Sequence, residues 1–77
     1  MANLSIEVAS IAEREATGYQ GAVICVSRGI TYRIGVLKSG SIIDPSRNGE
    51  STSIGKWPAN VIKNLAKTAA IYFPPSN

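Results

Sequence analysis

The hydrophobic residues of this chain change their spacing at Gly21, and this change restricts the folds that the sequence can adopt. Before it, over residues 4–17, apolar side chains recur about every 3.6 residues, as on one face of a helix. After it, residues 30–36 alternate between apolar and polar or small side chains, which is typical of a strand with one buried face. Helical spacing returns from residue 58. The sequence therefore predicts an α+β domain in which helices flank a sheet.

The first segment, residues 4–17, permits two interpretations. A helix could begin after Asn3 and end at Gly18, and residues 13–16 are strong helix formers. Residues 4–8, however, also alternate as a strand would. We expect a helix over 4–17, because the helical pattern is the longer one. For residues 4–8, a strand is kept as the alternative.

Three short strands are expected in the middle of the chain. They are residues 22–27, 30–38 and 41–43. Arg28-Gly29 is a two-residue connection of the hairpin kind, and a tight turn at 38–40 follows. The economical arrangement is a three-stranded antiparallel meander.

The clearest element is a helix predicted over residues 58–72. Pro58 suits a first helical turn, and Pro74-Pro75 must end the helix near Tyr72 or Phe73. The polar stretch 44–57 before it is expected to be a loop. The chain of 77 residues is thus expected to form one two-layer domain, 1–77, in the order α-β-β-β-α. Both helices are expected on one face of the sheet.

The composition argues against an enzyme. The chain has no histidine and a single cysteine, so the usual catalytic triads and three- or four-ligand zinc sites cannot be assembled. Cys25 lies in an apolar strand, where desolvation raises the pKa of a thiol and makes it unreactive. We expect no cofactor, no metal and no membrane span. A free thiol without an export signal predicts a cytoplasmic protein.

A sheet covered on one face leaves apolar residues without partners in the same chain. The residues expected to bind a protein partner are Ile42, Arg47, Ile54, Trp57 and Ile71. An alternative is that the 44–57 loop folds back and Trp57 closes the end of the core. We expect a small non-enzymatic protein-binding module that forms a homodimer through the uncovered sheet face or a strand edge. The 44–57 loop, with Trp57, is expected to dock on a larger protein or nucleoprotein partner. An inhibitor or accessory factor, as phages and mobile elements often encode, would have this character.

Basic residues suggest a second function. The net charge is +3, and Lys56, Lys63 and Lys67 share the helix face opposite the apolar one. With Arg47 they could contact a phosphate backbone, so nucleic-acid binding is the alternative. The same lysines could equally form a solvated helix surface.

Overall fold

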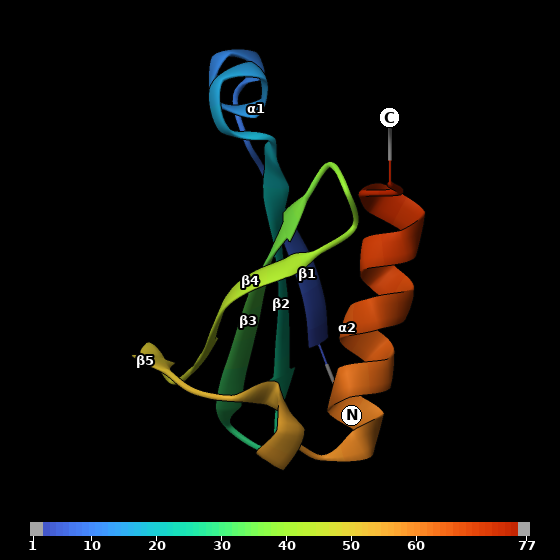
Figure 1. Ribbon diagram of the computed structural model, residues 1–77. Coiled ribbons are helices and arrows are strands. Elements are labelled where there is room, and N and C mark those ends of the chain that lie inside the picture. The colour runs from blue at the N-terminus through green and yellow to red at the C-terminus, as the bar shows by residue number, and fades with distance from the viewer. Residues whose placement is uncertain (1–2, 76–77) are drawn as a thin grey trace.

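The computed structural model describes residues 3–75, which form a five-stranded antiparallel sheet and two α-helices (Figure 1). The strands are β1 (Asn3–Val8), β2 (Tyr19–Ser27), β3 (Ile30–Leu37), β4 (Ile42–Arg47) and β5 (Glu50–Ser51), and the helices are α1 (Ile11–Thr17) and α2 (Ala59–Tyr72). One turn of 3₁₀-helix, Ile54–Lys56, precedes α2. Strand order in the sheet follows the sequence. The α+β class and the antiparallel meander are therefore confirmed, with five strands in place of three.

The helix predicted over 4–17 is wrong in its first half, where the chain forms β1. Each residue of β1 pairs with β2, from Asn3 opposite Val26 to Val8 opposite Gly21. The helix begins only at Ile11, because Ser10 is its N-cap and accepts a hydrogen bond from the Glu13 amide at 3.1 Å. Pairing of all six residues of β1 with β2 outweighs the helical pattern of residues 4–8.

The segment 44–57, predicted as a loop, contains the rest of β4, all of β5 and the 3₁₀ turn. Two hairpins have the same kind of two-residue turn, with glycine at the second position and a positive φ at both. Arg28-Gly29 has φ values of 52° and 77°, and Asn48-Gly49 has 52° and 83°. Positive φ at both central residues matches the right-handed twist of the strands that the turn joins. The first hairpin was predicted, and the second returns the chain from β4 to β5.

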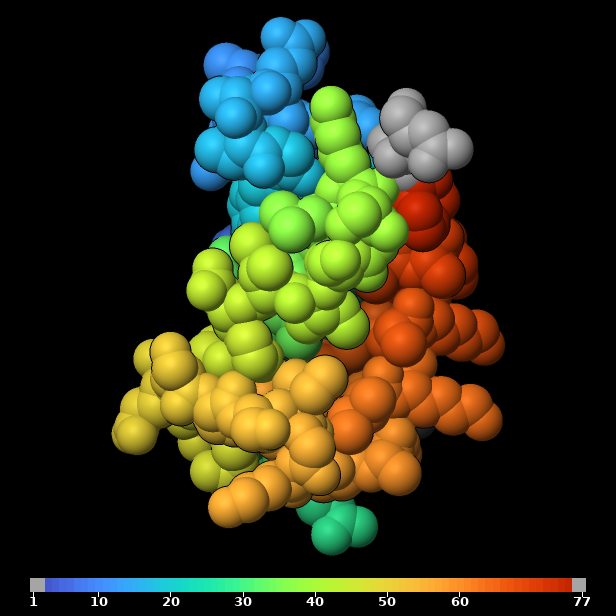
Figure 2. Space-filling view, viewed as in Figure 1, coloured from blue at the N-terminus to red at the C-terminus, as the bar shows by residue number. Residues whose placement is uncertain are grey.

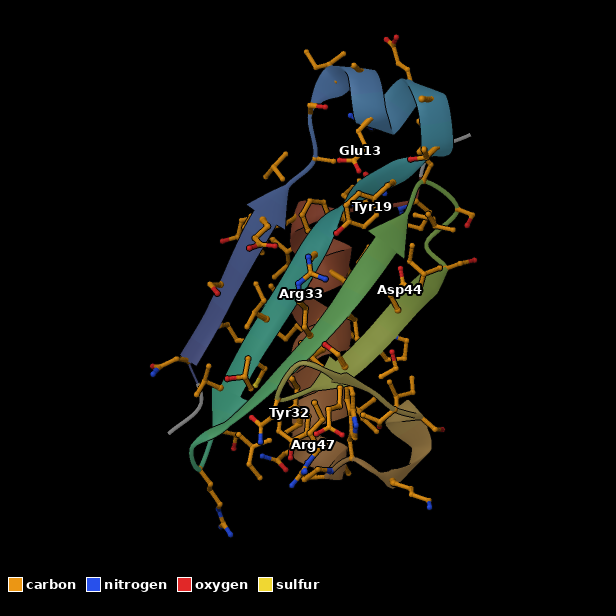
Figure 3. All side chains as sticks on the ribbon, turned by 90° about the vertical axis from the view of Figure 1, so that its left-hand side faces the viewer. Glu13, Tyr19, Tyr32, Arg33, Asp44 and Arg47 are labelled. Carbon is orange, nitrogen blue, oxygen red and sulfur yellow. The ribbon has the colours of Figure 1, made fainter. Side chains whose placement is uncertain are left out.

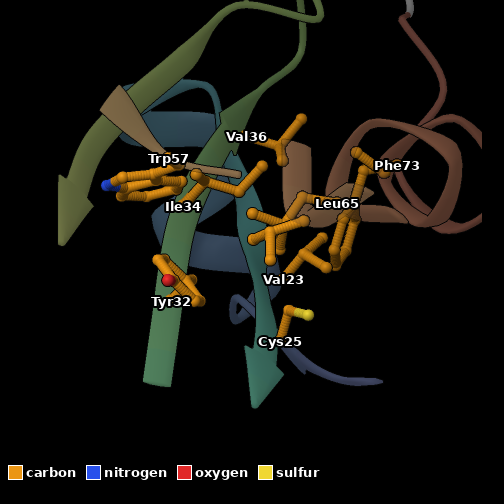
Figure 4. Close-up of a cluster of buried hydrophobic side chains, with 10 residues drawn as sticks. Val23, Cys25, Tyr32, Ile34, Val36, Trp57, Leu65 and Phe73 are labelled. Carbon is orange, nitrogen blue, oxygen red and sulfur yellow. The ribbon is translucent and has the colours of Figure 1, made fainter. Parts of the chain in front are cut away.

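The core lies between α2 and one face of the sheet (Figure 4). Val61, Leu65 and Ala69 of α2 are buried. They pack against the alternate residues of β2 and β3 that face the helix: Val23, Cys25, Tyr32, Ile34 and Val36. The predicted helix 58–72 agrees with α2 to within one residue. α1 contributes no buried residue and lies beyond one end of the sheet (Figure 1).

Trp57 closes one end of this core. Its side chain is only 6% exposed, and its ring meets the ring of Tyr32 edge-on with the centroids 5.0 Å apart. The indole N–H donates a hydrogen bond to Thr52 Oγ1 at 3.1 Å, so the ring is buried with its polar atom satisfied. The segment that leads to Trp57 lies against the start of α2 (Figure 2). The interpretation in which this segment folds back onto the core is the one observed.

The C-terminal end of α2 is attached to the start of β2. Phe73 is buried and lies against Gly21. Beside it, the buried Gln20 amide nitrogen lies 3.0–3.3 Å from the carbonyl oxygens of Leu37, Phe73 and Pro74. These contacts fix the position of α2 along the sheet.

Candidate protein-binding surface

The face of the sheet that α2 leaves open carries both polar and apolar side chains (Figure 3). Ile24 and Val26 of β2 lie on it and are half-buried, because they alternate with residues that face α2. Arg33 donates a hydrogen bond to Glu7 at 2.9 Å across β2, and this contact raises the pKa of the guanidinium. Tyr19 and Ile43 lie over Gly35, where a side chain would meet both at 3.0 Å. Within residues 3–75, no large hydrophobic side chain that is highly exposed belongs to this face. The apolar side chains of the open face are therefore partly covered by their neighbours.

The exposed apolar side chains lie mostly elsewhere, along β1 and the end of α2. Val8 is 73% exposed, Ile11 78%, Ile71 62% and Tyr72 58%. Together with Leu4 and the half-buried Ile6 they line two adjoining grooves that share Ile6 and Tyr72. We call these residues the β1 surface: Leu4, Ile6, Val8, Ile11, Ile71 and Tyr72. Contiguous exposed apolar residues on a small domain are typical of a binding site.

The larger groove of the β1 surface has a volume of about 490 Å³. Leu4 and Ile6 form one wall, and Thr68, Ile71 and Tyr72 of α2 form the other. The groove exists because α2 packs mainly over β2 and makes few contacts with β1. The outermost strand therefore extends beyond the helix that covers its neighbours.

The two edges of the sheet differ in their protection. β1 pairs only with β2, is six residues long, and contains neither Pro nor Lys nor a bulge. The opposite edge has a two-residue β5, Pro45, and an irregularity at Asp44, whose φ is 49°. Short strands, proline and bulges are the features by which proteins prevent pairing at a sheet edge. β1 lacks them, so its free backbone groups can accept a further strand.

The residues predicted to bind a protein partner do not form one surface. Ile42 is 40% exposed, and Ile54 is half-buried. Both line a small cleft with the buried Trp57, whose ring has its partners within the core. Arg47 is exposed at the end of β4. Ile71 lies apart from these four, on the β1 surface.

The residues of the β1 surface that sequence reasoning missed are Leu4, Ile6, Val8, Ile11 and Tyr72. A sequence signal existed for three of them, since the alternation of residues 4–8 places Leu4, Ile6 and Val8 on one face of a strand. Tyr72 shares a face of the helix 58–72 with the buried Val61 and Leu65, and this spacing would place it in the core. Phe73 takes that place because the helix ends there, and the Phe73 amide donates to Ala69 O.

The three lysines of the predicted stripe are all exposed. Lys63 and Lys67 are one turn apart on α2, and Lys56 lies in the turn before it. α2 contains no Asp or Glu, so no acidic residue within the helix offsets these charges. Lys67 also borders the larger groove of the β1 surface.

The chemistry of the remaining residues is limited. Cys25 is fully buried beneath α2, and this burial raises the pKa of its thiol, as the sequence indicated. Within the described part of the chain, no three His, Cys, Asp or Glu residues lie close enough to hold a metal ion. None of the helices in residues 3–75 is long and apolar enough to cross a membrane.

Comparison of the chain with protein-family models, with curated proteins and with solved structures finds no match.

Proposed function

We propose that this protein is a small non-enzymatic protein-binding module that binds through the β1 surface. An inhibitor or accessory factor is the kind of role that we infer. The buried free thiol of Cys25 is compatible with the cytoplasmic location that we also propose.

One observation carries the proposal: exposed apolar side chains gather beside an unprotected strand edge. A partner strand could pair with the backbone of β1 while its side chains enter the groove against α2. Main-chain hydrogen bonds would then supply affinity, and the apolar walls would supply specificity. Trp57 and Ile54 are not part of this surface, so the proposed site differs from the one expected from the sequence.

The test is affinity capture from the source cells with tagged wild-type protein and two variants. Ile71→Lys places a charge on the β1 surface, and Ile42→Lys makes the same chemical change near the opposite edge. We expect a protein partner (a second copy of this chain included) that wild type and Ile42→Lys retain and Ile71→Lys loses, with or without nuclease. Loss with Ile42→Lys alone, or no protein captured at all, would refute the proposal.

A second candidate function is nucleic-acid binding through Lys56, Lys63, Lys67 and Arg47. The absence of acidic residues from α2 favours it. If the protein makes three phosphate contacts, its affinity for nucleic acid should fall about forty-fold as the salt concentration rises from 50 to 200 mM. Substitution of Lys56 and Lys63 by Glu, which leaves the β1 surface intact, should abolish such binding. If wild type retards neither single-stranded nor duplex nucleic acid at low salt, this candidate is eliminated.

A further inference from the structure

We propose that the strand that pairs with β1 is β1 of a second copy of this chain, so that two copies form one continuous ten-stranded antiparallel sheet. This inference rests on the proposed function, because it names the occupant of the β1 surface. Three observations support it: the direction of the free backbone groups, the order of side chains along β1, and the position of the groove.

The backbone of β1 presents its free groups at alternate residues. The Ala9 amide donates to Gln20 O at 3.1 Å, which extends the β1–β2 pairing by one residue. In an antiparallel ladder, inward and outward residues alternate. Asn3, Ser5 and Glu7 therefore direct their N–H and C=O groups to β2. Leu4, Ile6 and Val8 direct theirs to the free edge.

Two-fold symmetry then selects one register. A two-fold axis between antiparallel edge strands is normal to the sheet, so both copies of α2 lie on the same face. With the axis at Ile6, Leu4 lies opposite Val8 of the second copy, and Ile6 lies opposite Ile6 of the second copy. All three outward-facing residues then form hydrogen-bonded pairs, each with two backbone hydrogen bonds.

The side chains of β1 are complementary to themselves in this register. On the α2 side, Leu4 meets Val8 and Ile6 meets Ile6. On the open face, Ser5 lies opposite Glu7, where its hydroxyl can donate to the carboxylate. A shift of the axis to residue 7 would place the two Glu7 carboxylates opposite each other, which is unfavourable. A shift to residue 5 would move Val8 past Asn3, the first residue of β1 in the second copy.

The groove is where a symmetric copy would bury its apolar side chains. Strands lie about 4.8 Å apart, so the two β2 strands, each beneath its α2, would be about 14 Å apart. A helix with its side chains is about 10–12 Å wide. The space left between the two copies of α2 lies above the two β1 strands. In each copy, Leu4, Ile6 and Ile71 already line this space. The second copy closes the groove on its open side, and the Lys67 ammonium groups can extend to solvent.

The first test is sedimentation equilibrium of wild type, Leu4→Lys and Ile42→Lys. Leu4 and Ile42 are 43% and 40% exposed, so the two substitutions are matched in chemistry and exposure. We expect a wild-type dimer in the micromolar range. Leu4→Lys should raise the dissociation constant of the dimer about 100-fold, because the two-fold symmetric dimer contains the lost apolar contact twice. Ile42→Lys should leave dimerisation within about twofold of wild type.

The second test examines the register by disulfide formation in oxidising buffer. Cα atoms of a hydrogen-bonded pair lie about 5.5 Å apart, within the range that a disulfide can bridge. The Cβ atoms of such a pair must approach from about 5.5 Å to the roughly 4 Å of a disulfide, a small shift for an edge strand, so Ile6→Cys should cross-link two copies. Ser5→Cys and Glu7→Cys should cross-link more slowly, because each lies opposite a different residue and is farther from its own counterpart. The native Cys25 is buried and does not compete.

Several results would overturn the inference. A wild-type monomer, or a dimer that Leu4→Lys leaves intact, excludes pairing through β1. Faster cross-linking of Ser5→Cys or Glu7→Cys than of Ile6→Cys excludes the register. If wild type is monomeric but captures another protein in a manner sensitive to Ile71→Lys, the second copy is excluded and the proposed function stands. If it is monomeric and captures nothing, both are excluded.

Discussion

Gly21 is the position where the fold tolerates a side chain least. Its φ is +155°, and a Cβ atom would overlap the Glu7 carbonyl oxygen and lie 2.6 Å from Phe73 Cζ. The first contact belongs to β1, and the second belongs to the ring that ends α2. Gly21→Ala therefore forces the edge strand or the helix terminus to move.

The expected loss of stability has two parts. An alanine in this backbone conformation costs about 1–3 kcal/mol. Insertion of a methyl group into a filled space costs about 1–3 kcal/mol more. The sum is about 2–6 kcal/mol, a large part of the stability of a domain of this size. Gly18→Ala is the matched control, because Gly18 also has a positive φ of 78° but nothing lies within 4 Å of its added Cβ.

The assay is urea unfolding of wild type and both variants, followed by the fluorescence of Trp57. Gly18→Ala should lose about 1 kcal/mol, the cost of the backbone conformation alone. Gly21→Ala should lose about 2 kcal/mol or more beyond that value. Equal losses in the two variants would show that Gly21 is not in close contact with β1 and Phe73, and the reasoning would be refuted.

Three further predictions concern the core and the open face. Trp57→Ala should cost about 3–5 kcal/mol, measured by thermal unfolding and circular dichroism, and wild-type emission should be that of a buried indole; a solvent-like spectrum would contradict the packing. Because the pKa of Cys25 is raised in the folded state, the unfolded chain loses the thiol proton first, and stability should fall as pH rises from about 8.5 upward. In Cys25→Ala, the contribution of this thiol to the loss of stability at high pH should be absent. If wild type and Cys25→Ala lose stability in parallel as pH rises, a raised pKa of Cys25 is contradicted. Glu7→Gln should cost only about 0.5 kcal/mol in urea unfolding, since both partners of the ion pair are partly exposed; a loss of several kcal/mol would show that the pair is structurally essential.

The parts of the fold that the sequence predicts correctly depend on local signals. Arg28-Gly29 indicates its hairpin, because glycine accepts a positive φ without strain. The helix over 58–72 follows from Pro58 at one end and Pro74-Pro75 at the other. Asn48-Gly49 carries the same kind of signal as the first hairpin. It was missed because the surrounding residues are too polar to resemble strands.

The errors concern segments whose structure depends on distant residues. Residues 4–8 form a strand because β2 pairs with them, whereas the local sequence permits a helix as well. Nothing near Trp57 in the sequence shows that Tyr32 supplies the other side of its site. The β1 surface combines residues from both ends of the chain, Leu4 and Ile71 among them. Such a surface becomes apparent only when the edge strand and the end of α2 are placed together.

Residue-resolved hydrogen exchange by NMR at two protein concentrations tests the central claim most directly. In the monomer, the amides of Leu4, Ile6 and Val8 face solvent and should exchange rapidly, while those of Ser5 and Glu7 are protected by β2. At concentrations where the second copy binds, we predict protection of Leu4, Ile6 and Val8 in addition. Rapid exchange of these three amides at every concentration, with Ser5 and Glu7 still protected, would contradict pairing through β1.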